Sequence, residues 1–411
     1  MKSSFSALAG LMGLAAAQSW PNGPFTASGR DILDASGNVV TLAGANWPGA
    51  ADVMIPEGLQ YQSVAYIVSK LKEINMNAVR LTYAIEMIDQ IYENGGVDIP
   101  LSQAFTQALG EANGTTVFNQ VLAANPDFSA NITRLEVFDA VAAELAANEI
   151  YIDLDNHMSQ GAWCCNTEDG NSWWGDTYFS VANWTRGLAY MADHAGSWTA
   201  LASMSLRNEP RRPDNNATLQ ETYNWQYWYE YVKEGAAAVS TANPDTLVVL
   251  SGLDFDTFLT PVVRGTALTP GSGTFSRADF AADKVVLELH NYANSVADCA
   301  SLESSLYNNG FQALNTSDAA AVNHFPVLLT EWGFAMDGST YTKPYTQCLA
   351  EYLPAQKAGW MIWVVAGSYY IRSGTQDYEE TWGLLSHDWS EWRDPAFVNS
   401  TLAPMVDATI S

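Results

Sequence analysis

The sequence predicts an α/β fold, a single (β/α)8 TIM barrel with inserted loops over the carboxyl ends of its strands. Eight short apolar or β-branched runs alternate with longer stretches rich in Ala, Leu and Glu, as in parallel β/α units. Eight parallel strands are the number that closes such a barrel. No Pro-rich or Ser/Thr-rich tether divides the chain of 411 residues. A doubly wound open sheet is the alternative, but no G-x-G-x-x-G follows the first strand.

The predicted strands follow one another along the chain at uneven intervals. We expect them near residues 39–45, 78–82, 150–155, 203–207, 247–251, 285–289, 327–330 and 360–364. Residues 83–149, between the second and third strands, are too many for one helix. We therefore expect an inserted substructure there, over the mouth of the barrel.

The first residues of the chain have the pattern of a secretory signal peptide. Lys2 precedes an apolar run that is too short to span a bilayer and ends in Ala15-Ala16-Ala17. An amphipathic first helix is the alternative. The expected division is therefore a signal peptide, 1–17, and one domain, 18–411, that is secreted to the extracellular space. No later segment is apolar over the length of a transmembrane helix.

Composition and charge narrow the class of ligand. Eighteen basic residues stand against 45 acidic ones, and the resulting charge of −27 repels nucleic acid and anionic membranes. The chain also contains 15 Trp. Because the faces of aromatic rings stack on sugar rings, this content favours a carbohydrate partner. We expect a monomer. Glycosylation sequons begin at Asn113, Asn131, Asn183, Asn216, Asn315 and Asn399.

Two glutamates end predicted strands in a way that surface glutamates seldom do. The active site of a barrel lies at the carboxyl ends of its strands, and Glu209 and Glu331 each follow an apolar run at that end. Cleavage of a glycoside needs two carboxyl groups, one that protonates the leaving oxygen and one that attacks the anomeric carbon or activates water. Other polar or aromatic residues at predicted strand ends are Asn46-Trp47, Arg80, Asn156-His157, Asn208, His290-Asn291-Tyr292 and Trp363.

The motifs around both glutamates resemble those of glycoside hydrolase family 5, the cellulase family, and the resemblance covers nearly all of the mature chain. Leu206-Arg-Asn-Glu-Pro210 resembles its N-E-P signature on strand 4, and Thr330-Glu-Trp-Gly-Phe334 its nucleophile motif on strand 7. The resemblance implies a retaining hydrolase of a β-linked glucan or mannan that acts by double displacement. Glu209 would be the acid/base and Glu331 the nucleophile. A transglycosylase, or a catalytically silent carbohydrate-binding barrel, is the alternative.

The same resemblance implies residues that support the two glutamates or bind the sugar. Arg80 and Tyr292 would stabilise the charge of Glu331. Asn208 would bind the sugar 2-hydroxyl. Further residues that would line the site, contact the acid/base or stack on the sugar are His157, His290, Trp363 and Trp47. Core packing for the Trp and His residues, and a structural ion pair for Arg80, are the alternatives.

Two loop segments and two arginines near the predicted site have less specific sequence patterns. Residues 161–166 and 173–176 follow His157, and we expect both segments in the wall of the cleft. Arg211 and Arg212 would either contact a leaving-group sugar or face solvent at the start of a helix.

The positions of the cysteines indicate which disulfides can form, and the spacing of the histidines indicates whether they form a metal site. Cys299 and Cys348 fall on neighbouring β/α units, so we expect a disulfide between them, which leaves Cys164 and Cys165 as a vicinal disulfide or two thiols. A vicinal pair is not part of the common cellulase pattern. The five His lack paired metal-ligand spacing, and we predict no cofactor and no metal.

Overall fold

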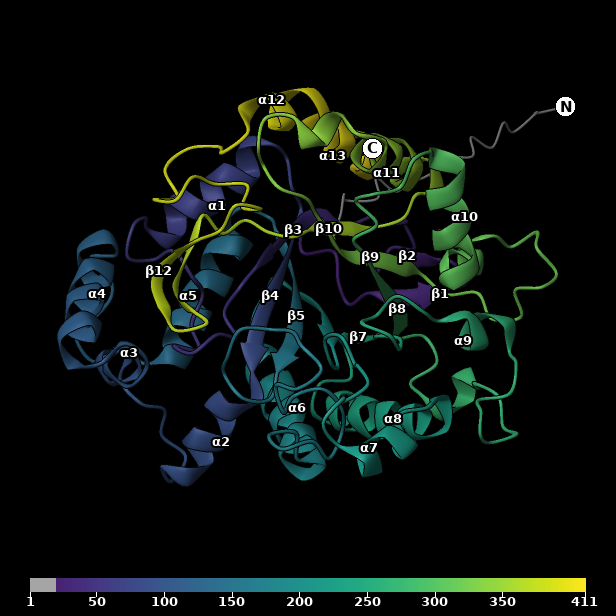
Figure 1. Cartoon of the computed structure of the whole chain (residues 1–411), viewed down its shortest axis with the longest axis horizontal. Coiled ribbons are helices and arrows are strands. Elements are labelled where there is room, and N and C mark those ends of the chain that lie inside the picture. The colour runs from purple at the N-terminus through teal and green to yellow at the C-terminus, as the bar shows by residue number, and fades with distance from the viewer. Residues whose placement is uncertain (1–19) are drawn as a thin grey trace, which may run out of the picture.

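The computed structural model describes residues 20–411, and the predicted signal peptide, 1–17, lies outside these residues. Eight parallel strands form a closed barrel in the order β10-β3-β4-β5-β6-β7-β8-β9, with helices around it (Figure 1). The predicted barrel is therefore confirmed, and each predicted strand overlaps an observed one. The barrel strands are β3 (Ala43–Trp47), β4 (Ala78–Ala84), β5 (Tyr151–Met158), β6 (Leu201–Ser205), β7 (Leu247–Leu250), β8 (Val285–Asn291), β9 (Val327–Trp332) and β10 (Trp360–Ile362).

The outer layer of the barrel consists of amphipathic helices whose starts are encoded locally. Thr133 caps the helix that begins at Arg134 by a reciprocal capping box with Glu136, and Ser63, Ser180 and Asp298 each cap a helix with their side-chain oxygen. The outer helices are α1 (Val64–Glu73), α5 (Arg134–Ala147), α6 (Val181–Ala195), α8 (Trp225–Ala242), α9 (Thr260–Arg264), α10 (Cys299–Asn309), α11 (Pro344–Gln356) and α13 (Ala403–Ile410), with shorter helices α7 (Ala217–Thr222) and α12 (Pro395–Phe397).

A small antiparallel pair, β1 (Thr26–Ser28) and β2 (Asp31–Leu33), covers the amino ends of the barrel strands. Phe25, Ala27 and Ile32 form a core cluster with the first residues of several barrel strands. The backbone of Ala27 donates to the carbonyl of Asp283, 2.7 Å away. This end of the barrel is thus sealed, and the opposite end is the one available for a site.

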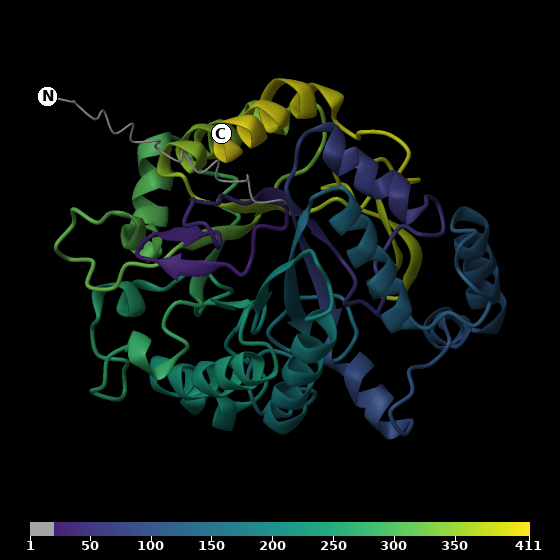
Figure 2. The ribbon, with the colours of Figure 1, turned by 180° about the vertical axis from the view of Figure 1, so that it is seen from behind.

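The insertion after β4 forms helices that reach the side of the molecule and contact a hairpin at the barrel mouth. It contains α2 (Ile85–Glu93), α3 (Leu101–Leu109) and α4 (Glu111–Ala124) before α5, and α3 and α4 form a pair at the side of the molecule (Figures 1 and 2). Leu109 of this pair accepts a hydrogen bond of 3.0 Å from Gln376. Gln376 belongs to a hairpin after β10, made of β11 (Ser368–Arg372) and β12 (Thr375–Glu379), whose residues line the mouth.

Both cysteine pairs are bonded in the structure. Cys299, at the start of α10, is joined to Cys348 of α11, with their Cα atoms 5.2 Å apart. Cys164 is joined to its neighbour Cys165. Within residues 20–411, no helix has the length and apolar character needed to cross a membrane.

Candidate active site

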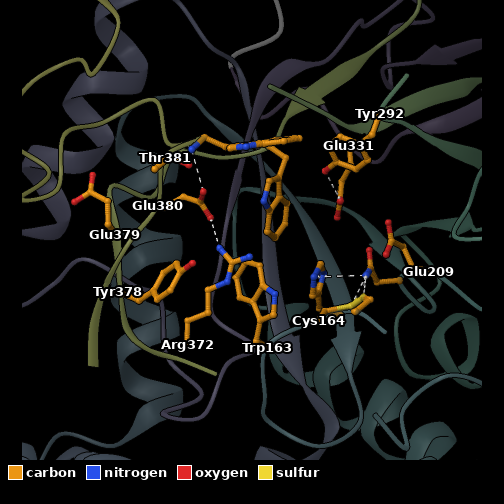
Figure 3. A pocket seen from close by; sticks show the side chains of 15 residues that line it. Trp163, Cys164, Glu209, Tyr292, Glu331, Arg372, Tyr378, Glu379, Glu380 and Thr381 are labelled. Carbon is orange, nitrogen blue, oxygen red and sulfur yellow. Dashed lines mark hydrogen bonds and ion pairs between the residues drawn. A yellow bond between two sulfur atoms is a disulfide. The ribbon is translucent and has the colours of Figure 1, made fainter. Parts of the chain in front are cut away.

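The two predicted catalytic glutamates face each other at the carboxyl end of the barrel (Figure 3). Glu331 is on β9, and Glu209 follows β6. A carboxylate oxygen of each, together with a ring nitrogen of His290, lie within 4.8 Å of one another. Glu209 has a φ of 46°, a left-handed conformation that costs a non-glycine residue about 1–2 kcal/mol. Its backbone N–H donates to Asp256 at 2.8 Å, which helps to hold this conformation.

Glu331 is bound by donors on both of its carboxylate oxygens. The Arg80 guanidinium donates to one oxygen at 2.7 Å, and the Tyr292 hydroxyl donates to the other at 2.8 Å. Burial and the nearby carboxylates raise the pKa of Tyr292 well above its ordinary value, so the phenol keeps its proton. Charge-assisted bonds of this kind favour the ionised carboxylate, the form that a nucleophile needs.

Glu209 is in a different electrostatic environment. Burial raises the pKa of Glu209 to about 7, although Arg211 and Arg80 oppose the shift. The Nδ1 atom of His290 lies 2.9 Å from Glu209 Oε1, and burial lowers the pKa of His290 to about 4. At acidic pH above this value the imidazole is neutral and Glu209 is protonated, so this carboxyl can serve as a proton donor.

Arg80 is the cation of a buried cluster of carboxylates beneath the two glutamates. Its guanidinium lies 3.1 Å from Asp155, 3.6 Å from Glu288 and 3.8 Å from Asp153. Burial disfavours the charged guanidinium, but these carboxylates outweigh it and keep the pKa of Arg80 above its usual value. Burial in turn raises the pKa of Asp153 to about 7. The positive charge of Arg80 therefore interacts both with Glu331 and with the buried carboxylates of the barrel interior.

His157 and Asn208 line the floor between the glutamates. His157 Nδ1 lies 2.6 Å from Asp155, and burial lowers the pKa of His157 to about 3, which leaves the ring neutral. Its ring stacks on Trp363, with centroids 5.4 Å apart and an angle of 11°. The Asn208 Oδ1 atom accepts a bond of 2.9 Å from Arg80, so its amide nitrogen points to the cleft side.

These groups border a cavity of about 410 Å³, a size within the range of ligand pockets. Nine of the predicted residues line it. Six are predicted site residues, His157, Asn208, Glu209, Tyr292, Glu331 and Trp363, and three come from the predicted wall segment, Trp163, Cys164 and Cys165. Sequence analysis missed the opposite wall, which the hairpin and the residues after it supply: Arg372, Tyr378, Glu379, Glu380, Thr381 and Trp382.

The structure corrects several predicted positions. Trp47 is completely buried and its indole donates to the carbonyl of Glu57 at 3.0 Å, so it packs in the core and presents no face to the cavity. Trp173 and Trp174 are likewise buried, in an aromatic cluster behind the cleft. Arg211 is buried and ion-paired with Asp169, so it neither faces solvent nor reaches the cavity.

Three residues of the site are of types that can bind a metal ion as well as transfer protons. Glu209, His290 and Glu331 are close enough to share a cation. However, Arg80 and Tyr292 already occupy both oxygens of Glu331, and Glu209 carries a proton at acidic pH. Cys164 and Cys165 are bonded to each other and offer no thiolate. The arrangement suits proton transfer and nucleophilic attack better than metal ligation.

Comparisons with known proteins agree with this chemistry. Residues 33–368 match the family described as cellulase (glycosyl hydrolase family 5). A glycosyl hydrolase 5 family protein of Chamaecyparis obtusa is 33% identical over 396 residues, which are 92% of this chain and 65% of that protein. The chain thus spans just under two thirds of this relative. The major extracellular endoglucanase of Xanthomonas campestris is 23% identical over 89% of this chain and 68% of its own length.

Solved structures share the fold. The catalytic domain of the Xanthomonas campestris endoglucanase superposes with a TM-score of 0.67 at 20% identity, over 93% of this chain and 99% of that one. A Pyrococcus horikoshii endocellulase in complex with cellotetraose superposes with a TM-score of 0.68 at 16% identity, over 93% and 98% of the two chains.

Proposed function

The chain belongs to the cellulase family, glycosyl hydrolase family 5, and from this premise we propose that it is a secreted, retaining hydrolase of a β-linked glucan or mannan. The observation that carries the proposal is the separation of the two carboxylates, whose nearest oxygens are within 4.8 Å. Retaining glycosidases hold their carboxyl groups about 5 to 5.5 Å apart, whereas inverting enzymes leave about 6.5 to 9.5 Å for a water. The short separation supports direct attack by one carboxylate.

The proposed reaction has two steps. In the first, Glu331 attacks the anomeric carbon and forms a bond to it, while the bond to the leaving oxygen breaks and Glu209 gives that oxygen its proton. In the second, Glu209 takes a proton from water, whose oxygen displaces Glu331 from the anomeric carbon. Arg80 and Tyr292 hold Glu331 for the first step and stabilise it again as the departing carboxylate in the second.

The shape of the cleft supports a substrate with more than one sugar. The sugar that is cleaved would lie near Trp363, whose ring contacts those of His157 and Trp163. Beyond Trp163 lie Arg372 and Tyr378, away from Glu209 (Figure 3). Because the acid/base marks the leaving-group side, the hairpin would bind the next sugar on the other side of the bond.

One experiment tests both the activity and its stereochemistry. The purified enzyme is incubated with β-1,4-glucan, β-mannan, β-1,3-glucan and β-1,6-glucan, with Glu331→Gln as the matched control, and the first product anomer is followed by proton NMR. We expect the β-anomer to appear first on at least one glucan or mannan. An α-anomer would overturn retention, and products unchanged by Glu331→Gln would overturn the site. Added acceptor sugar shows whether transfer competes with hydrolysis.

A further inference from the structure

The Cys164–Cys165 disulfide lies inside the catalytic cleft. Both residues line the cavity and are partly exposed to it. A sulfur of each and a carboxylate oxygen of Glu209 are within 4.8 Å of one another, and Cys164 is seen next to Glu209 in Figure 3. A sugar that reaches Glu209 and Glu331 must therefore pass close to the two sulfurs.

Both sulfurs also face one specific polar group. The side-chain nitrogen of Asn208 is 3.5 Å from the sulfur of Cys164 and 3.6 Å from that of Cys165. The other end of the Asn208 amide is fixed by Arg80. Sulfur is a weak hydrogen-bond acceptor. The disulfide therefore restricts the position of the Asn208 amide nitrogen, but it binds the hydrogen atoms of that nitrogen only weakly. The Nε2 atom of His157 is also 3.5 Å from this nitrogen. Contacts of this length are weak, so the amide hydrogens can still be donated to a substrate hydroxyl.

The loop that carries the disulfide is anchored to the backbone of the acid/base. Buried Arg211 donates to the carbonyl of Asn166 at 2.7 Å and to the carbonyl of Glu209 at 3.0 Å. At the start of the loop, the backbone N–H of Gly161 donates to Glu86 at 2.8 Å. Residues 161–166 are thus held at both ends, and the position of the sulfurs is fixed relative to Glu209.

We propose that the Cys164–Cys165 disulfide is a positioning element of the active site, which holds the Asn208 amide where it donates to the 2-hydroxyl of the sugar being cleaved. The proposal rests on the glycosidase function above. Hydrogen bonds to the 2-hydroxyl strengthen in the transition state of glycoside cleavage. Loss of the disulfide therefore lowers kcat more than it raises KM, and does so only for substrates that have a 2-hydroxyl.

The test compares an aryl β-cellobioside with its analogue that lacks the 2-hydroxyl on the ring attached to the aryl group. In Cys164→Ala/Cys165→Ala, we expect kcat/KM to fall by roughly tenfold or more on the first substrate and by much less on the second. Asn208→Ala shows the same selectivity, and the cysteine changes have little further effect in that background. Cys299→Ser/Cys348→Ser is the matched control, because it removes a disulfide remote from the cleft and leaves the ratio of the two substrates unchanged.

A second arm avoids dependence on the folding of the cysteine variant. In the Cys299→Ser/Cys348→Ser protein, a phosphine reduces the vicinal disulfide of the folded enzyme, alkylation and mass spectrometry count the two thiols, and the same substrate ratio is measured. Equal losses on both substrates, or no loss in either arm, overturn the positioning role. If the unmodified enzyme cleaves neither substrate nor any glycan, the proposed hydrolase function is wrong. Failure of the positioning proposal alone is distinguishable, because the unmodified enzyme is then active.

Discussion

At the scale of single residues, the two carboxyls proposed to be catalytic, Glu209 and Glu331, differ because their surroundings differ. A nearby negative charge and burial can each raise the pKa of a carboxyl group such as that of Glu209. In the structure burial is the main cause, and the pKa rises to about 7. This difference, with Glu209 desolvated and Glu331 bound by donors, supports the proposed roles of proton donor and nucleophile.

The pH dependence of activity follows from this difference. Because Glu209 must be protonated for the first step, kcat/KM should fall as pH rises through about 7. In Glu209→Ala, assayed on an activated aryl glycoside that needs no proton, the alkaline limb should disappear and the acid limb should remain. An alkaline limb that persists unchanged in this variant would identify another group as the donor.

The rates of cleavage of substrates with different leaving groups should distinguish the roles of the two glutamates. Glu331→Gln removes the nucleophile and should abolish turnover of every substrate. Glu209→Ala should retain most of its activity on aryl glycosides with good leaving groups but lose roughly 100-fold or more on a natural glycan. The measurement is a series of aryl glycosides of increasing leaving-group pKa, and a slope equal to that of the unmodified enzyme would contradict the role of Glu209.

At the scale of elements, the strands were predictable and the hairpin was not. Parallel barrel strands are buried on both faces and read as continuous apolar runs, as in Val327–Leu329 of β9. The second strand of the hairpin, β12, is polar and mostly exposed, so no apolar run marks it. A usable signal was present in Ser373-Gly374, a two-residue turn with both φ values positive, as hairpins favour.

The positions of Glu209 and Glu331 at strand ends were predictable because motif and strand end coincide. Trp47 also ends a strand, yet its ring turns into the core. Successive side chains of a strand point to opposite faces, so the position in the strand decides whether a ring points to the core or to the cavity. In a short barrel strand that is apolar on both faces, the sequence does not show which direction one side chain takes. Residues of the opposite cleft wall, such as Arg372 and Tyr378, depend on how a long loop folds back over the mouth.

The hairpin is held to the loop after it by His387, which gives a prediction on stability. Partial burial disfavours the charged ring, but hydrogen bonds to Asp377 and Glu379 outweigh it and raise the pKa of His387. A raised pKa in the folded state means that this contribution is present below the unfolded value of ~6.5 and is lost as pH rises.

His387→Gln should therefore lower the free energy of unfolding at pH 5 by about 0.5 kcal/mol, since the site is partly exposed and screened, and should change little at pH 8. Denaturant unfolding at the two pH values measures the difference. A loss that is larger at pH 8 would show that the charge of His387 is not what holds the hairpin.

At the scale of the whole molecule, the barrel interior is organised around one buried cation. Arg80 has carboxylates on several sides, and its removal leaves them unpaired. Arg80→Leu should lower the free energy of unfolding by about 3 to 5 kcal/mol at neutral pH. Burial already raises the pKa values of Asp153 and Asp155, and loss of the cation raises them further.

The gap between Arg80→Leu and the unmodified protein should then narrow as pH falls, because the folded variant binds more protons than the unfolded chain. Denaturant unfolding between pH 5 and pH 8 tests this. A gap that is constant with pH would mean that Arg80 contributes by packing alone.

The closure of the barrel joins segments from the two ends of the described chain. The last barrel strand, β10, pairs with the first, β3, through Trp360 and Ala43, and the indole of Trp360 donates to Thr409 of α13 at 2.9 Å. During synthesis, β3 and β9 therefore remain unpaired edges until the residues beyond Trp360 have been made. Such late, non-local pairing slows folding and keeps sheet edges exposed to association with other chains. The growing chain consequently stays open until the residues of β10 are available.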